Sequence, residues 1–397
     1  MTSSGSYIVA GARTPIGKMS GGLASFSAAD LGGFAISAAL ERAGVAPDEV
    51  QHVIMGQVLM AGQGQVPSRQ AAVKAGIPMS VPSVNVNKVC LSGLNTIYLA
   101  NQMIASGEAD IVVAGGMESM TNAPYLLPGA RAGYRYGNSD IVDAIQHDGL
   151  YCALEHELMG EGTERYAASA AIARETQDAI AAASHDRAAR ATKDGLLADE
   201  IAAVTVPQRR GDDVIVTNDE GIRGGTDVES LGRLRPAFAS SGNITAGNAS
   251  QISDGASATI ICSAETAASL GVEPLAELVS YGQVAGPDTS LLTQPSRAIR
   301  QALEKADMDV GQIDLFEINE AFAAVSAASM DDLGITDDIV NVNGGALALG
   351  HPIGCSGNRL ALTLAYELGR RGGGTCAAAL CGGGGQGDAL VLRSVSS

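Results

Sequence analysis

Short apolar runs alternate along the chain with longer stretches in which apolar residues recur at helical spacing. In the first third of the chain, the apolar runs predict buried strands at residues 7–10, 53–55, 84–90 and 111–114. Ser27 and Asp30 resemble a capping box at the start of a helix, and Gly44 suits its end. A further helix is predicted from Ser92 to Gly107. This alternation favours right-handed βαβ units and a largely parallel sheet.

The pattern changes between about residues 122 and 248. Residues 125–136 mix aromatic, proline and arginine residues and are typical of a surface excursion, whereas the alanine-rich residues 163–193 predict helix. Arginines gather at 209–235 with acidic residues between them, which fits either an anion site or a mixed solvated face. We interpret residues 122–248 as an inserted domain.

Strand patterns return at residues 257–262 and continue through a second half of the chain. Strands are predicted at 275–279, 313–316, 340–343, 375–380 and 389–392, and helices at 297–306, 320–330 and 357–371. In both halves a cysteine, a helix, a strand and a group of glycines follow one another, starting from Cys90 and from Cys355. This coarse repeat predicts two similar α/β halves whose loops meet. The expected division is an N-terminal half at 1–271, with its core at about 1–121 and 249–271, and a C-terminal half at 272–397.

Charge and cysteine content narrow the function classes. The net charge of -18 argues against a nucleic-acid or anionic-membrane partner, so an anionic substrate would need a local basic patch. The 6 cysteines show no disulfide framework and indicate reduced thiols. Residues 1–7 lack a basic and apolar leader, residues 394–397 match no known address, and no apolar run reaches the ~18 residues of a membrane span. We therefore expect a cytoplasmic protein.

Two glycine-dense loops carry candidate chemistry. Residues 341–357 hold His351, which suits proton transfer near neutral pH, and a second such loop begins with Cys381. Cys90 precedes a helix and lies beside Lys88, a combination that lowers a thiol pKa and favours the nucleophilic thiolate. A histidine near either thiol would be its base. The alternatives are a buried, capped histidine and cysteines that serve as small apolar residues. His and Cys without paired spacing argue against zinc.

Four motifs resemble the signatures of the thiolases in order and spacing. They are Asn87-Lys-Val-Cys-Leu-Ser-Gly93, Asn319-Glu-Ala-Phe-Ala323, the run from Asn343 to Gly357, and Cys381-Gly-Gly-Gly-Gly-Gln-Gly387. The similarity extends from Val9 to Leu392. It implies the thiolase fold, an α/β fold of two similar βαβαβαββ halves in five αβαβα layers with an inserted loop domain.

The resemblance implies a reversible Claisen condensation of two acetyl-CoA molecules to acetoacetyl-CoA and CoA, with no metal and no bound cofactor. Cys90 would carry the acyl group, His351 would activate Cys90, and Cys381 would be the acid and base for the α-proton. His351 and a water held by Asn319 would form one oxyanion site. The backbone N–H groups of Cys90 and Gly383 would form the other, with glycine at 383 keeping side-chain atoms away from the thioester oxygen.

The resemblance also assigns the inserted domain to coenzyme A, which enters as part of the acyl-CoA substrates. The matching positions are Met159, Arg223, Ser230, Leu234, Phe238, Ala246, Ser250 and Phe322. Met159 and Phe322 would line the acyl end. A homotetramer built as a dimer of dimers is implied too, with residues 125–143 as the candidate assembly loop.

Two positions depart from the family pattern. Leu158 stands where short-chain biosynthetic thiolases carry a histidine near the thioester, and His156 is badly placed to replace it. The alternative is therefore a 3-ketoacyl-CoA thiolase that accepts a broader range of chain lengths. Gly382 stands where many relatives carry a β-branched residue.

Three other functions use part of the same residue set. A decarboxylating ketosynthase pairs cysteine with two histidines, or with histidine and asparagine, and the second cysteine at 381 argues against it. A Cys-His-Asn hydrolase would need neither Cys381 nor a CoA-sized insert. A non-catalytic acyl-CoA carrier would tolerate the loss of Cys381.

Overall fold

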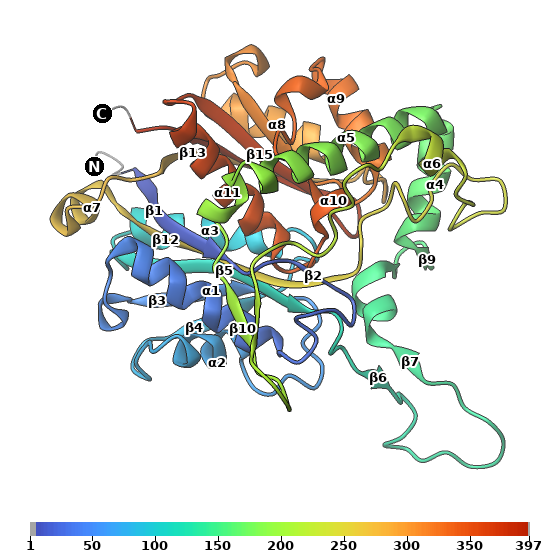
Figure 1. Ribbon diagram of the computed structural model, residues 1–397, viewed down its shortest axis with the longest axis horizontal. Coiled ribbons are helices and arrows are strands. Elements are labelled where there is room, and N and C mark those ends of the chain that lie inside the picture. The colour runs from blue at the N-terminus through green and yellow to red at the C-terminus, as the bar shows by residue number, and fades with distance from the viewer. Residues whose placement is uncertain (1–4, 396–397) are drawn as a thin grey trace.

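The structure is a computed structural model that describes residues 5–395 (Figure 1). The expectations about the ends of the chain involve Met1 to Ser4, Ser396 and Ser397, which lie outside the described residues. None of the helices within residues 5–395 is long and apolar enough to cross a membrane.

The main strands form one continuous sheet that is narrow at its middle. In spatial order they are β14 (Leu315–Ile318), β15 (Thr375–Gly382), β16 (Gln386–Arg393), β13 (Ala276–Ala285), β1 (Ser6–Arg13), β12 (Ser253–Ser263), β5 (Ile111–Ser119), β3 (His52–Gly56) and β4 (Ser83–Val86), with β2 (Gly17–Lys18) paired to β12. Where β1 meets β13, the pairing is limited to Tyr7 with Glu277 and Ile8 with Ala276. The sheet therefore divides into an N-terminal group, β1, β3, β4, β5 and β12, and a C-terminal group, β13 to β16.

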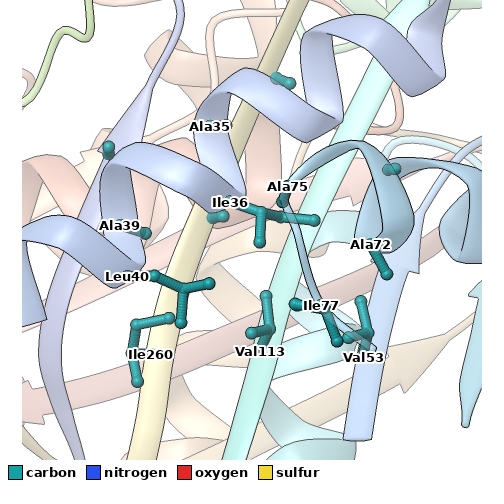
Figure 2. Close-up of a cluster of buried hydrophobic side chains, with 14 of the residues drawn as sticks. Ala35, Ile36, Ala39, Leu40, Val53, Ala72, Ala75, Ile77, Val113 and Ile260 are labelled. Carbon is teal, nitrogen blue, oxygen red and sulfur yellow. The ribbon is translucent and has the colours of Figure 1, made fainter. Parts of the chain in front are cut away.

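Helices cover the outer faces of both groups and fill the space between them (Figure 1). They are α1 (Ala28–Ala43) and α2 (Pro67–Lys74) outside the N-terminal group, α3 (Ser92–Ala105) and α11 (Ser356–Arg370) in the middle, and α8 (Gln294–Lys305) and α9 (Ala323–Leu333) outside the C-terminal group. Figure 2 shows the outer N-terminal core, where Ile36 and Leu40 of α1 lie over Val53, Val113 and Ile260 of the sheet. The arrangement has the five αβαβα layers that the thiolase resemblance implies.

Strand β5 shows why the central strands are apolar on both faces. Ile111 and Val113 belong to the core beneath α1, whereas Val112 and Ala114 belong to the core around α3 and α11. Side chains alternate between the two faces of a strand, so a strand covered on both sides needs an unbroken apolar run.

The segment between β5 and β12 contains short strands and three α-helices, of which α5 has 20 residues. They are β6 (Tyr125–Leu126), β7 (Val142–Asp143), β8 (Tyr151–Cys152), β9 (Glu157–Leu158), α4 (Met159–Ser169), α5 (Arg174–Lys193), β10 (Val204–Val206), β11 (Val214–Val216) and α6 (Val228–Gly232). The helix predicted at 163–193 is thus two helices, because the chain takes a left-handed conformation at Ala171, with a φ of 53°. The remaining helices are α7 (Ala264–Leu270) and α10 (Ala346–Leu349).

Three expectations about strands are wrong. The sheet is mixed, because β3–β4, β3–β5 and β14–β15 are parallel whereas β12 and β16 run antiparallel to their neighbours. The strand predicted at 340–343 is reduced to one bridge between Val340 and Phe316. Asn341, with a φ of 47°, turns the chain there, and its side chain bonds the backbone of Ile318 in place of a ladder. The strand predicted at 84–90 ends at Val86.

The predicted start and end of α1 are confirmed. The Ser27 side chain accepts from the Asp30 backbone N–H, and the Asp30 carboxylate accepts from the Ser27 backbone N–H. Gly44 ends the helix in a left-handed conformation, with a φ of 63°.

Candidate active site

A cavity of about 670 Å³ is lined by residues close to the strands of both groups and by residues of the segment between β5 and β12. Cys90, His351 and Cys381 all line it. Cys90 lies just before α3, His351 lies between α10 and α11, and Cys381 lies near the end of β15. Groups from three distant parts of the chain therefore face one space.

Most of the other residues matched to thiolase positions line the same cavity, namely Met159, Arg223, Phe238, Ala246, Ser250, Phe322 and Gly383. Ser230 and Leu234 line a neighbouring cavity of about 190 Å³, which shares Arg223 and Ala246 with the first. Asn319 does not line the cavity, but its side chain contacts His351. The two adjoining cavities are thus lined by every position that the resemblance singled out except Asn319, which contacts the lining residue His351.

His351 is held on both sides of its ring. Its Nδ1 lies 2.6 Å from the hydroxyl of Ser356, and its Nε2 lies 3.4 Å from Nδ2 of Asn319. Burial, together with the positive charge of Arg359, lowers the pKa of His351 to about 3. The imidazole is therefore neutral at pH 7 and has a free lone pair to accept a proton.

Cys90 lies in a tight turn whose preceding residue is strained. Val89 has a φ of 52°, which is rare for a β-branched residue. The turn is held by Asn87, whose side chain accepts from the Val89 N–H at 3.0 Å, and by Ser92, whose hydroxyl donates to the Val89 carbonyl at 2.6 Å. A strained turn in front of a candidate nucleophile fixes the direction in which the side chain points.

The expectation of a low thiol pKa at Cys90 is wrong. Burial, with a contribution from the negative charge of Glu118, raises the pKa of Cys90 to about 12. Lys88 does not offset this, because its Nζ lies 2.7 Å from the carboxylate of Asp388. In the resting site both the thiol and the imidazole of His351 are neutral, so the proton must move as the thiol attacks.

Cys381 opens the tight turn that joins β15 to β16. Burial raises the pKa of the Cys381 thiol, and a negative charge on Cys90 raises it further. Glycine is required at residue 385, where φ is 67° and a Cβ would lie 2.0 Å from the carbonyl oxygen of Asp288. At residue 383 a Cβ would meet Val89 at 3.5 Å, an ordinary contact, so the protein's own atoms do not demand glycine there.

The two departures from the family pattern have different structural settings. Leu158 lines the cavity beside Met159, whereas His156 is exposed in the turn between β8 and β9 and does not line it. Gly382 leaves room for Leu91, because a Cβ at residue 382 would lie 2.6 Å from Cγ of the fully buried Leu91 side chain. Leu91 thus fills the space that a side chain at residue 382 would need.

Glu118 and Lys18 were missed by sequence reasoning. Glu118 ends the apolar run of β5, and its buried carboxylate accepts from the backbone N–H groups of Val58, Leu59 and Gly354. Burial raises its pKa to about 7 despite these bonds. A carboxylate at the end of a buried apolar run is a recognisable signal of a group that orders the neighbouring loops. Lys18 lines the cavity and, with Arg223, supplies the local basic residues that an anionic substrate needs.

The arrangement combines two thiols with one neutral imidazole in a largely apolar cavity. Such a set can form a thioester on one sulfur and move a proton with the other. Among residues 5–395 there is no group of three or more His, Cys, Asp and Glu side chains placed to hold a metal ion.

Comparison with known proteins agrees with the geometry. The family model for the thiolase N-terminal domain matches residues 6–265, and that for the thiolase C-terminal domain matches residues 272–394. The chain is 55% identical to a probable acetyl-CoA acetyltransferase of Mycobacterium leprae over 98% of this chain and 99% of that protein. It is 47% identical to an acetyl-CoA acetyltransferase of Cupriavidus necator over 97% of this chain and 98% of that protein.

A solved structure gives the same answer for the fold. The crystal structure of the Bacillus anthracis acetyl-CoA acetyltransferase superimposes with a TM-score of 0.96 at 38% identity, covering 99% of each chain. The predicted thiolase fold is confirmed. The chain belongs to the thiolase family.

Proposed function

We propose that this thiolase is an acetyl-CoA C-acetyltransferase, which condenses two acetyl-CoA molecules to acetoacetyl-CoA and CoA and also runs the reverse thiolysis. The observation that carries this proposal is the convergence of Cys90, Cys381 and His351 on one cavity. The relatives named acetyl-CoA acetyltransferase support the substrate. Acyl-CoA thioesters are substrates here, and the chain's own thiols and imidazole supply the reacting groups.

In the first half-reaction, His351 takes the proton of Cys90 as the sulfur attacks the thioester carbonyl of acetyl-CoA. The C–S bond to CoA then breaks, CoA leaves with a proton returned by His351, and the acetyl group stays on Cys90. The backbone N–H groups of Cys90 and Gly383 stabilise the oxyanion. The neutral state of His351 at pH 7, which follows from its low pKa, supports its role as the base.

In the second half-reaction, Cys381 reacts as its thiolate and removes a proton from the α-carbon of another acetyl-CoA, and the carbanion attacks the acetyl carbonyl on Cys90. The new C–C bond displaces the Cys90 sulfur, and this sulfur regains the proton that Cys381 took from the α-carbon, which returns Cys381 to its thiolate. The enolate oxygen is stabilised by a water held by Asn319 and by His351 in the form that carries a proton on Nε2. In support, Oδ1 of Asn319 is buried and has no partner within the described protein. Fixed donors of this kind supply several kcal/mol of stabilisation to a developing oxyanion.

The segment at about 122–248 binds the CoA part of the substrate in this proposal. Lys18 and Arg223 at the cavity meet its negative charge, and Ser230 and Leu234 line the neighbouring space. Phe238 and Phe322 meet edge to face, with 6.1 Å between ring centres, and form an apolar wall. Met159 and Phe322 line the acyl end, and Ala246 and Ser250 complete the pantetheine contacts.

Leu158 favours a second candidate, a 3-ketoacyl-CoA thiolase that accepts longer chains, because it adds an apolar side chain to the cavity wall. Each buried methylene contributes roughly 0.8 kcal/mol. A thiolysis series over 3-ketoacyl-CoA chain lengths, followed at the enolate absorbance, separates the two. The narrow enzyme loses kcat/KM beyond four carbons, whereas the broader enzyme keeps it.

Two substitutions test the assignment of the cysteines. Cys90→Ser is expected to abolish the release of CoA in a burst from acetyl-CoA, because serine is a much weaker nucleophile at this position. Cys381→Ser is expected to keep that burst and to lose condensation. Burst labelling retained in Cys90→Ser, or normal acetoacetyl-CoA turnover in Cys381→Ser, would contradict the assignment. Release of CO₂ from malonyl-CoA would indicate a ketosynthase instead.

We further propose a cytoplasmic homotetramer, a dimer of dimers, that acts in fatty acid metabolism. The hairpin formed by β6 and β7 projects away from the body (Figure 1), and Tyr125, Leu127, Tyr136 and Ile141 on it are exposed. Exposed apolar residues gathered on one projection are typical of an assembly surface. A monomer in light scattering would contradict this proposal.

A further inference from the structure

The turn that carries Cys90 touches the turn that follows Cys381. Val89 packs on residue 383, where a Cβ would lie 3.5 Å from its methyl groups, and Leu91 fills the space above Gly382. Both residues that flank Cys90 therefore rest on the β15–β16 turn. These contacts are apolar, and they persist only if other interactions keep the two turns side by side.

One ion pair links the turn that carries Cys90 to strand β16 in the other half of the chain. The Nζ of Lys88 lies 2.7 Å and 2.9 Å from the carboxylate oxygens of Asp388, and 2.9 Å from Oε1 of Gln283. The Asp388 side chain is fully buried, and its Oδ2 also accepts from the hydroxyl of Tyr281 at 2.8 Å. Tyr281 stacks on Tyr98 of α3, with 4.7 Å between ring centres, so the carboxylate is fixed from several sides.

Both partners lie next to the reacting groups without lining the cavity. Lys88 is two residues before Cys90, and its backbone N–H donates to the hydroxyl of Ser92, which also holds Val89. Asp388 pairs with Leu380 across β15 and β16, and the neighbouring pair in the same register is Cys381 with Gly387. Lys88 and Asp388 are both absent from the cavity lining, so they would act on the reaction through the residues around them.

We propose that the Lys88–Asp388 pair is a positioning device that holds the sulfur of Cys90 at its working separation from the sulfur of Cys381. Strain at Val89 persists only where surrounding contacts over-determine the turn, and this pair is the charged contact that does so from the other half. The role presupposes the proposed reaction, in which an acetyl group on Cys90 must meet a carbanion formed beside Cys381.

Comparing the rates of acylation and thiolysis distinguishes a positioning role from a general loss of structure. Acylation of Cys90 by acetyl-CoA needs Cys90 and His351, whereas thiolysis of acetoacetyl-CoA needs both cysteines. For Lys88→Met we expect kcat for thiolysis to fall roughly 100-fold, as for a misplacement of about 1 Å, with KM and the acylation burst each changed less than about threefold. Lys88→Arg keeps the charge and is expected to retain most of the turnover.

Arg393→Met is the matched control. Arg393 lies on β16, the strand of Asp388, but at the far end of that strand, and the substitution removes its ion pair with Glu277 of β13. Its kcat should equal that of the wild type. If Lys88→Met fails to fold, Asp388→Asn, which keeps the shape and the contact with Tyr281, replaces it with the same expected pattern. Thiolysis within about threefold of wild type, or a burst that falls as much as kcat, would overturn the positioning role. Wild-type protein without any thiolysis would instead contradict the proposed function.

Discussion

The hydroxyl of Ser356 lies 2.6 Å from Nδ1 of His351 and 3.1 Å from the carbonyl oxygen of Pro352. A hydroxyl carries one proton, and the Pro352 carbonyl can only accept, so that proton belongs to the bond with Pro352. The hydroxyl oxygen then accepts from Nδ1–H of His351. This leaves the lone pair on Nε2, the nitrogen beside Asn319, as the proton acceptor for Cys90.

Ser356→Ala should therefore weaken the base without removing it. Without the hydroxyl, the imidazole populates the tautomer in which Nε2 carries the proton, and that form cannot deprotonate Cys90. We expect the acylation rate to fall by about 10- to 100-fold, a part of what a positioned base contributes, with KM little changed. Rapid mixing with acetyl-CoA measures this rate.

Ser280→Ala provides the control, because its hydroxyl donates to the Ala302 carbonyl at 2.7 Å in the outer layer of the C-terminal half. It should leave acylation unchanged. Equal rates in wild type and Ser356→Ala would show that the tautomer is set by other contacts.

The close packing of the Leu91 side chain against Gly382 gives a prediction about stability. Gly382→Ile places side-chain atoms against a leucine that is fully buried, and such overpacking costs about 1–3 kcal/mol. Leu91→Ala alone leaves a cavity and costs roughly 2–5 kcal/mol. The double variant should cost less than the sum, because the new side chain fills that cavity. Urea unfolding of all four proteins measures the coupling, and additive costs would contradict the size match.

Much of the fold and of the site was readable from local pattern. The capping box at Ser27, the glycine at 44 and the apolar runs depend on neighbours in sequence, and the motifs around Cys90, His351 and Cys381 are long and ordered. The direction of β12 and β16 was not readable, because it depends on the sheet neighbours that each strand finds after a turn or a long excursion.

The prediction of a low thiol pKa for Cys90 failed for a similar reason. Lys88 looked like a cation beside a thiol, but its partner Asp388 lies 300 positions away in the sequence. Burial, which no local motif reports, then determines the pKa of the thiol.

A buried histidine away from the reacting groups gives a prediction about pH. Nδ1 of His185 accepts from the Arg223 N–H at 3.1 Å, and burial, with the charge of Arg223, lowers the pKa of His185 to about 4. The unfolded chain binds a proton on this imidazole below pH ~6.5, whereas the folded protein does not until the lower value. His185 therefore stabilises the fold fully above pH ~6.5, and this contribution is lost as the pH falls toward 4.

His185→Gln keeps an acceptor for the Arg223 N–H but does not titrate. Its free energy of unfolding should fall less steeply than that of the wild type between pH ~6.5 and ~4.5, by up to about 1.4 kcal/mol per pH unit. Other groups, including Glu118, titrate equally in both proteins and cancel in the difference. Urea unfolding at several pH values measures it, and parallel curves would show that His185 does not contribute.

Arg13 joins β1 to the segment between β5 and β12 through a buried charge cluster. Its guanidinium lies 2.6 Å from Glu200 and 2.7 Å from Asp219, and all three side chains are almost fully buried. Arg13→Met would leave two carboxylates in the interior without their cation, and breaking a buried pair in this way costs roughly 3–5 kcal/mol.

The exposed pair of Arg233 with Glu229 is the matched control, because its side chains are 69% and 84% exposed and such pairs contribute less than about 1 kcal/mol. Urea unfolding should therefore separate Arg13→Met from Arg233→Met by several kcal/mol. Equal stabilities of the two variants at neutral pH would mean that water enters the cluster and solvates the carboxylates.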